Sequence, residues 1–354
     1  MKFSTAYCQL SCNSPTDLVL SGLRNTALIV NGQVIEIHGT VTLTRGASLN
    51  GCFIKAMPGS KLICKSTPIY SGTYNFDNTT FTSCSGTWGG IEVNARTRCF
   101  ISNNCKIEKA YIGVKGLSGA VVSLENSEFL NNATGISLNG NVSLLKLNKC
   151  KFESTPTTMY LASSGIDLID CVQNIYIGAS GNLQGLNIFK NLRTGFYSTN
   201  SNFYLSNSIF EGCEYGVYYL NSYTPKVCNI TGLGISSQLT FDNSNISNIL
   251  GLGSCNLTVT QCKSRRVKST GNNSTDAYHG IWIYWNENGK IDINYNKFDT
   301  DGLANTGSGV RHDMVRIEGG NTMGCNVSNN IHNDINSEFI RSIDMISTNA
   351  RGIL

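Results

Sequence analysis

Carboxylate, imidazole and guanidinium groups gather between residues 299 and 313. They are Asp299, Asp301, Arg311, His312 and Asp313. Two carboxyl groups at a suitable separation can act as the acid and the base, or as the nucleophile, of a glycoside hydrolase. A polysaccharide lyase needs a base such as His312 or Arg311, often with calcium on Asp carboxylates. Asp and Asn side chains also hold loop turns through hydrogen bonds to the backbone, and the sequence favours this simpler role.

Aromatic residues mark a second candidate site. The alternation in Gly280-Ile281-Trp282-Ile283-Tyr284-Trp285 predicts a strand with Ile281 and Ile283 inward and with Trp282 and Tyr284 outward. The matching outward positions of other repeats are Glu92, Lys115, Ser137, Tyr160, Tyr218 and Trp282, with Tyr197 in a repeat whose register is open.

A row of rings can stack on sugar rings or other planar groups. The same rings can also cover one another or lie under a loop, and the sequence leaves both alternatives open. The predicted ligand-binding residues are Tyr160, Tyr197, Tyr218, Trp282 and Tyr284.

Other kinds of site find no support in the sequence. The four histidines lack metal-ligand spacing, and phosphate-binding loops and Ser-His-Asp arrangements do not occur. We therefore expect no metal and no cofactor, apart from calcium if the protein is a lyase.

The elements that position these residues are predicted from a repeat. A small residue is followed two places later by an aromatic or aliphatic one, as in Glu125-Asn126-Ser127-Glu128-Phe129, and an alternating pair such as Val122/Leu124 precedes it. This alternation predicts a strand, and the Asn-rich corner after it suits a left-handed turn. A second strand follows, marked by pairs such as Gly135-Ile136 and Gly216-Val217. The spacing of roughly 18–27 residues is that of one β-solenoid coil.

The composition agrees with an all-β chain. Only 14% of residues are charged and 40% are hydrophobic, with 36 glycines, so helix formers are scarce and a packed core is possible. The net charge of +4 is spread along the chain. The one basic cluster, Lys263, Arg265, Arg266 and Lys268, favours a solvated loop, so we expect no nucleic-acid partner. No membrane span and no secretory leader are recognisable.

The 14 cysteines suit an export compartment. Several fall at the small position of the repeat and are expected to be free thiols stacked inside the solenoid. This predicted column is Cys52, Thr79, Cys105, Ser127, Cys150, Cys171, Ser208, Ser244 and Cys262. The candidate local disulfides are Cys8–Cys12 and Cys99–Cys105.

The chain resembles the pectin-lyase-like superfamily of right-handed parallel β-helices. More narrowly, Trp88-Gly89-Gly90-Ile91 and the coil from Ile107 to Val114 resemble motifs of large secreted repeat proteins of Bacteroidetes. The resemblance covers residues 40 to 354 and implies a single-stranded β-helix of roughly 11–13 coils at a surface or outside the cell. It does not specify an activity, because this superfamily includes lyases, hydrolases, adhesins and inert stalks.

These observations predict a cap or first coil over residues 1–40 and a β-helix over 41–354 that continues, or is covered by another domain or chain, beyond residue 354. The leading hypothesis is a secreted or cell-surface protein, adhesin-like or structural, that binds glycans or other surfaces. The alternative is a polysaccharide lyase or glycoside hydrolase acting in a cleft along the helix. A third is a passive stalk without a ligand.

Overall fold

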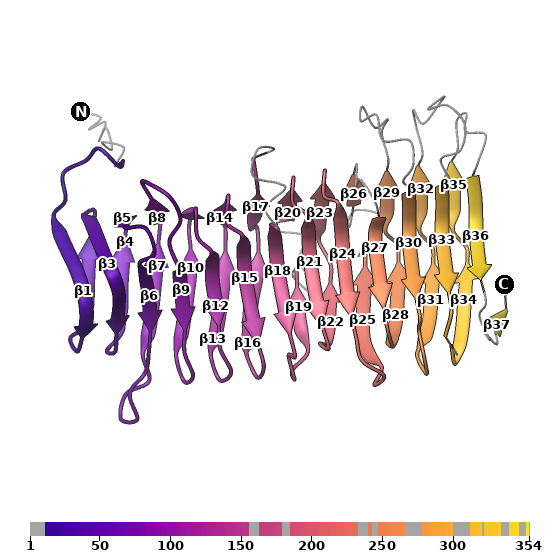
Figure 1. Cartoon of the computed structure of the whole chain (residues 1–354), viewed down its shortest axis with the longest axis horizontal. Coiled ribbons are helices and arrows are strands. Elements are labelled where there is room, and N and C mark those ends of the chain that lie inside the picture. The colour runs from indigo at the N-terminus through magenta and orange to yellow at the C-terminus, as the bar shows by residue number, and fades with distance from the viewer. Residues whose placement is uncertain are drawn as a thin grey trace, which may run out of the picture.

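The computed structural model describes residues 11–155, 163–178, 185–232, 240–242, 247–265, 278–299, 312–320, 322–333, 340–346 and 352–353. The elements in these ranges are β-strands, and every ladder between them is parallel. The strands stack along the long axis of the molecule to form a parallel β-helix (Figure 1).

Each coil contributes strands to three faces, here called sheets 1, 2 and 3. Sheets 1 and 2 are joined because β1 (Leu18–Arg24) and β3 (Val34–Leu43) continue from one to the other. The other strands of sheet 1 are β5 (Phe53–Ala56), β8 (Thr80–Ser83), β11 (Cys105–Glu108), β14 (Ser127–Leu130), β17 (Lys151–Glu153), β20 (Asn187–Lys190), β23 (Ser208–Glu211), β26 (Thr240–Asp242), β29 (Lys263–Arg265), β32 (Lys297–Asp299) and β35 (Ile331–Asn333).

Sheet 2 carries the face on which the aromatic residues lie. Its strands are β6 (Lys61–Cys64), β9 (Gly90–Val93), β12 (Ile112–Gly116), β15 (Thr134–Asn139), β18 (Ser164–Ile169), β21 (Thr194–Thr199), β24 (Tyr215–Leu220), β27 (Ser247–Leu252), β30 (Tyr278–Tyr284), β33 (His312–Glu318) and β36 (Ile340–Ile346). With β3, sheet 2 holds one strand per coil, and the number of described coils falls within the predicted range.

Sheet 3 closes each coil and has two parts. The first consists of β2 (Leu28–Asn31), β4 (Ala47–Asn50), β7 (Thr73–Asp77), β10 (Arg98–Ser102), β13 (Val121–Glu125) and β16 (Ser143–Asn148). The second consists of β19 (Ile175–Ile177), β22 (Phe203–Leu205), β25 (Lys226–Thr231), β28 (Cys255–Thr260), β31 (Lys290–Asn294), β34 (Gly324–Ser328) and β37 (Gly352–Ile353). The predicted division at residue 40 stays a prediction.

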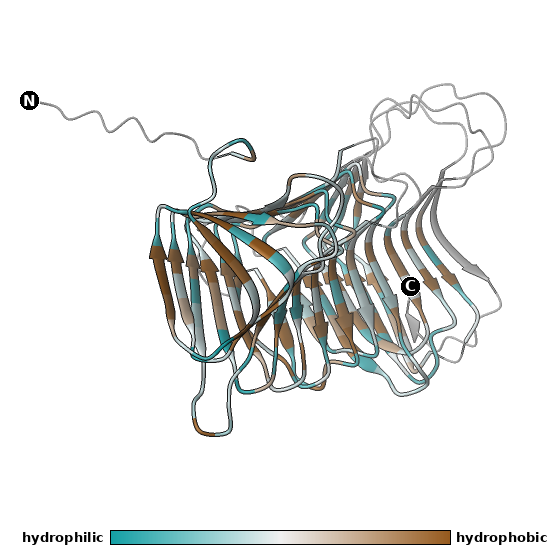
Figure 2. Ribbon diagram, turned by 60° about the vertical axis from the view of Figure 1, so that its left-hand side comes forward, coloured by the Kyte–Doolittle hydropathy of each residue, from teal (hydrophilic) through white to brown (hydrophobic). Residues whose placement is uncertain are grey.

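The corners confirm the predicted role of asparagine. Asn78, Asn126 and Asn207 have φ angles of 45°, 46° and 42° at the turn from sheet 3 to sheet 1. Asn adopts this left-handed conformation more readily than most residues, so the chain can turn there without a glycine. Hydrophobic residues lie mainly in the strands, and hydrophilic residues occupy many of the turns (Figure 2).

The core contains a stack of phenylalanines under sheet 1. Phe129, Phe152, Phe189 and Phe210 stand in consecutive coils, with ring centroids 4.9, 4.9 and 4.7 Å apart. The neighbouring glycine column of sheet 2 leaves space for these rings. A Cβ built on Gly165 would lie 2.6 Å from a Phe189 ring atom and 2.4 Å from the Gly195 oxygen.

Small buried residues form the predicted column at the start of sheet 1. The free cysteines of the described chain, among them Cys52, Cys105, Cys150 and Cys262, are all buried, which confirms the prediction of stacked thiols. Burial raises the pKa of the Cys105, Cys150 and Cys262 thiols to about 12. At neutral pH these groups therefore behave as small apolar side chains.

The placement of Cys171 in this column was wrong. Cys171 follows β18 of sheet 2, and its backbone N–H donates to Ser201 Oγ at 2.8 Å. Asn187 holds the predicted position in that coil and accepts from the Cys150 N–H at 3.0 Å. The error arose because the alternating Ile166 and Leu168, which belong to sheet 2, resemble a strand of sheet 3. Ser244 lies outside the described residues.

The disulfide candidates were also wrong. Cys12 is bonded to Cys84, and Cys228 to Cys255, whereas Cys99 and Cys105 are free. Cys8 lies outside the described residues.

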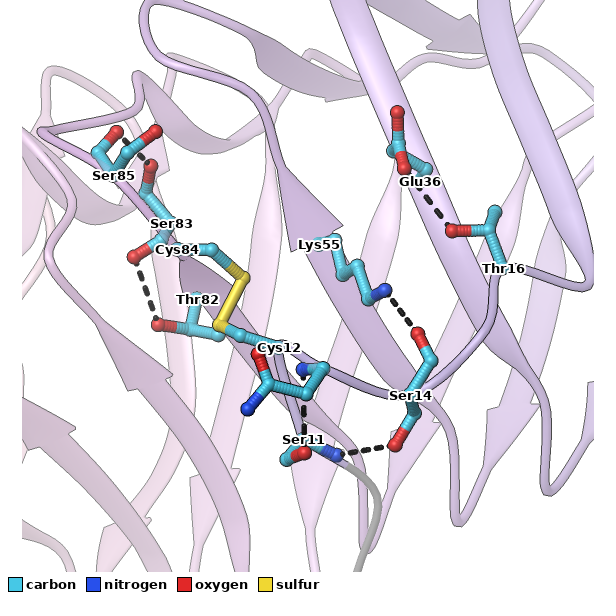
Figure 3. The surroundings of a disulfide bond; sticks show 11 residues. Ser11, Cys12, Ser14, Thr16, Glu36, Lys55, Thr82, Ser83, Cys84 and Ser85 are labelled. Carbon is cyan, nitrogen blue, oxygen red and sulfur yellow. Dashed lines mark hydrogen bonds between the residues drawn. A yellow bond between two sulfur atoms is a disulfide. The ribbon is translucent and has the colours of Figure 1, made fainter.

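The first disulfide anchors a strap formed by residues 11–17 (Figure 3). Cys12 is bonded to Cys84, directly after β8. The Lys55 ammonium group on β5 donates to the Ser14 carbonyl, and Thr16 Oγ1 donates to Glu36 Oε2 on β3 at 3.1 Å. The strap therefore crosses three consecutive strands of sheet 1 before the chain enters β1.

Candidate functional site

The outer face of sheet 2 brings the predicted aromatic residues into one column. Tyr197 of β21 pairs with Tyr218 of β24, Tyr218 with Leu250 of β27, and Leu250 with Trp282 of β30. These four residues are called the aromatic column below. Ile281 and Ile283 are buried, as predicted, so Trp282 and Tyr284 point outward. The strands that carry the column lie side by side in the second half of the helix (Figure 1).

Neighbouring rings of the column contact each other without stacking face to face. The Tyr197 and Tyr218 centroids are 5.4 Å apart with an interplanar angle of 75°, and Tyr215 lies 5.6 Å from Tyr218. Burial raises the pKa of the Tyr218 phenol. Leu250, between Tyr218 and Trp282, is only 7% exposed, so its flanking neighbours cover much of it.

A second apolar row lies beside the column, two residues further along each strand. Leu220, Leu252 and Tyr284 pair in register, and Leu220 and Tyr284 are 40% and 43% exposed. We call the two rows, with Tyr215, the aromatic face. Adjacent apolar side chains on an exposed strand surface are unusual for a protein that makes no contact there.

Charged residues stand at the edges of the aromatic face. At one end Arg316 of β33 follows Trp282 in register. Its guanidinium carbon lies 5.5 Å from the Trp282 ring centroid, and the guanidinium forms an ion pair with Glu318. At the corner with sheet 1, Arg193 Nε lies 3.8 Å from Glu214 Oε2.

Asp167 stands at the other end of the column, one coil before Tyr197. Its carboxylate accepts hydrogen bonds from the hydroxyls of Ser164 and, at 3.3 Å, Thr134. Burial raises the pKa of Asp167, and these two hydrogen bonds lower it less than burial raises it. The face thus begins with a hydrogen-bonded carboxyl group and ends with a paired guanidinium.

The position predicted for Tyr160 belongs to Asp167. Ser137, Asp167 and Tyr197 pair in consecutive coils, whereas Tyr160 lies outside the described residues. Gly165-Ile166 is the copy of the Gly-Ile pair in this coil, and it sets the register. Glu92, Lys115 and Ser137 occupy the predicted outward positions in register. The register of Tyr197, which the sequence left open, is set by its pairing with Asp167 and Tyr218.

Three of the candidate catalytic residues border one corner. Asp299 ends β32, and His312 and Asp313 begin β33, while Asp301 and Arg311 lie outside the described residues. In the coil of β23 and β24 the matching strand ends are joined by three residues, 212–214. Because β32 and β33 continue the same two ladders, Asp299 and Asp313 hold the positions that Glu211 and Tyr215 hold in that coil, and His312 directly precedes Asp313. The catalytic roles stay predictions.

Two residues at this site were missed from the sequence. Asp167 follows the pair Gly165-Ile166 just as Ser137 follows Gly135-Ile136, so this signal could have placed it. Arg316 could be placed only by knowing the register of β33, since no glycine precedes it at the corresponding position.

In the part of the chain that the structure describes, no cluster of His, Cys, Asp and Glu has the arrangement of a metal site. None of its elements is a helix long and apolar enough to cross a membrane.

Comparisons with known proteins bear on the fold. The model of the family described as "Right handed beta helix region" matches residues 69–227, and no curated protein matches the chain. Among solved structures, the chain is similar to a single-residue mutant of the periplasmic alginate epimerase AlgG, with 11% identity over 92% of this chain and 78% of that one and a TM-score of 0.38. Unmutated AlgG gives 12% identity over 94% and 78%, with a TM-score of 0.34. The described coils and the family match identify the fold as a right-handed parallel β-helix; a kinship with Bacteroidetes proteins stays a prediction.

Proposed function

We propose that this protein binds a polysaccharide along the aromatic face of sheet 2 and acts outside the cytoplasm, either secreted or displayed on a cell surface. The observation that carries the proposal is the in-register column of Tyr197, Tyr218 and Trp282, flanked by Leu220 and Tyr284. Aromatic rings offer large, rigid apolar contact surfaces with polar atoms at their edges, which suit the apolar faces of sugar rings.

The spacing of the rings favours an extended ligand. Adjacent strands lie about 4.8 Å apart, so Tyr218 and Trp282, two coils apart, present rings separated by about 10 Å along the helix axis. A chain of sugars running along that axis can contact both rings. The ring contacts among Tyr197, Tyr215 and Tyr218 hold these side chains in place and reduce the entropy lost on binding.

An oxidising location is supported by the strap. Structural disulfides persist mainly in secreted and extracytoplasmic proteins, and Cys12–Cys84 joins segments that are 72 residues apart in sequence.

The proposal is tested by retention of the purified protein on a panel of polysaccharides. We expect Trp282→Ala and Tyr218→Ala each to weaken retention by about 2- to 12-fold, since an aromatic contact contributes about 0.5–1.5 kcal/mol. The matched control is Tyr176→Ala, because Tyr176 is 51% exposed on sheet 3 and stacks on Tyr204. Thermal unfolding verifies that each variant is folded. Retention unchanged in both sheet 2 variants, or absent from the wild type as for a passive stalk, would contradict the proposal.

A second candidate function is cleavage of the bound polymer by a lyase or hydrolase at the corner between β32 and β33. The placement of Asp299 and Asp313 at the two matching strand ends of this corner, with His312 directly before Asp313, favours it. New unsaturated ends with calcium present would identify a lyase, and new reducing ends alone a hydrolase. An activity unaffected by Asp301→Asn would show that this corner is not the catalytic site.

A further inference from the structure

We infer that the polysaccharide bound on the aromatic face is uncharged. This inference rests on the proposed function and adds the chemical class of the ligand. It follows from the charges in and around the face.

The interior of the face has no group that is charged at neutral pH. Its members are Tyr197, Tyr215, Tyr218, Leu220, Leu250, Leu252, Trp282 and Tyr284. A uronate chain carries one carboxylate per sugar, and laying it here would remove water from those carboxylates, while none of these eight side chains supplies a cation in return.

Among the described residues, the two arginines at the edges of the face are engaged by carboxylates. Arg193 is paired with Glu214, and Arg316 with Glu318. Further along sheet 2, Lys61 Nζ lies 2.5 Å from Glu92 Oε2. A uronate would have to displace one of these partners, whereas the hydroxyls of a neutral sugar could donate to their remaining lone pairs.

Asp167 adds to the discrimination. Its carboxylate lies one coil from Tyr197 and accepts from two hydroxyls. When ionised it repels a ligand carboxylate but can accept from a sugar hydroxyl. The Asp167 end of the column therefore selects against negative charge.

Sheet 1, across the corner, has the opposite character near the same coils. Lys263, a member of the basic cluster noted in the sequence, pairs there in register with Lys297. A polymer lying on those lysines would be anionic and its binding sensitive to salt. Binding on sheet 2 therefore predicts a neutral ligand and weak salt dependence, whereas binding on sheet 1 predicts an anionic ligand and strong salt dependence.

The experiment compares retention of the wild type on neutral polymers (xylan, galactomannan and a mixed-linkage glucan) and on uronates (polygalacturonate and alginate), at low and high NaCl. We expect retention on at least one neutral polymer, with less than about twofold change with salt. Retention should weaken in Trp282→Ala but not in Lys263→Ala. Retention on uronates only, or equal retention on both classes, would overturn the inference while leaving the proposed function standing. Retention on neither class would overturn both.

A gain of binding provides an independent check. Glu214→Gln removes the carboxylate partner of Arg193 at the corner directly before Tyr215. We expect uronate retention to rise about twofold to fivefold, the range in which exposed ion pairs act, with neutral retention unchanged. A wild type that retains uronates as strongly as this variant does would contradict the inference.

Discussion

Asp167 combines an outward position on its strand with buried surroundings. It occupies an outward register position of sheet 2, yet burial raises its pKa while Ser164 and Thr134 hydroxyls donate to it. A carboxyl group with a raised pKa binds its proton more tightly in the folded protein than in the unfolded chain. Stability therefore falls as pH rises from the ordinary value of 3.8 toward the raised value.

Asp167→Asn is expected to remove this pH dependence. The wild type should lose stability relative to the variant as pH rises through the window above 3.8, because only the wild type buries a charge there. Denaturant unfolding at a series of pH values measures the difference. Asp170→Asn, at an exposed position three residues later, is the control and should run parallel to the wild type. If the stability of Asp167→Asn changed with pH in the same way as that of the wild type, ionisation of Asp167 would not be the cause of the pH dependence.

At the scale of strands, the glycine column of sheet 2 and the phenylalanine stack of sheet 1 depend on each other. Gly135, Gly165 and Gly195 each approach a Phe ring and the backbone oxygen of the next coil closer than any Cβ allows. The phenylalanine rings are 4.7–4.9 Å apart, which is also the spacing of paired strands. The coils therefore cannot move apart to accept a larger side chain without losing ring contacts and strand hydrogen bonds.

Gly165→Ala should therefore destabilise the protein by about 1–3 kcal/mol, the range for overpacking a rigid core. The comparison is Gly51→Ala, where a Cβ meets nothing within 4 Å but φ is +63°. That variant should cost only the strain of the left-handed backbone, about 1–2 kcal/mol. Urea midpoints and m-values measure both. A Gly165→Ala variant as stable as the wild type would mean that the coils can separate locally.

The same glycines explain how far the sequence could predict the fold. Gly-Ile pairs mark sheet 2 because only glycine fits beside the phenylalanines, so the coils and the outward position of Trp282 followed from local pattern. The register failed at Tyr160, where a long segment precedes Gly165, and at Cys171, where apolar alternation in sheet 2 resembles that in sheet 3. Alternation reports which side of a strand is buried, but not which sheet the strand belongs to.

Contacts between distant segments had no local signal at all. Cys12 and Cys84 are 72 residues apart, and nothing in the spacing of 14 cysteines distinguishes this pair from the alternatives. One charged end of the aromatic face, Arg316, was equally hidden. It adjoins the aromatic column through the register of β33, which no glycine in that strand marks, whereas the pair Gly165-Ile166 could have placed Asp167.

At the scale of the whole molecule, a solenoid is held together by contacts between neighbouring coils. Each strand pairs only with the coils directly before and after it, so an end coil has a partner on one side alone and is expected to open first. The strap changes this at the N-terminal end, because it joins Cys84 after β8 with Lys55 on β5 and Glu36 on β3. Opening of the first coils then requires the strap to be released.

Cys12→Ser and Cys84→Ser should therefore each loosen the N-terminal coils alone. We expect faster amide hydrogen exchange in β1, β3 and β5, corresponding to a loss of about 2–4 kcal/mol of local protection, and unchanged exchange in β27, β28 and β30. Reduction of the wild type should reproduce the pattern in β1, β3 and β5, since the other N-terminal cysteines of the described chain are buried free thiols. Exchange that rose equally in both regions would mean that the solenoid unfolds as one unit. In that case the strap would stabilise the whole molecule, the aromatic face included.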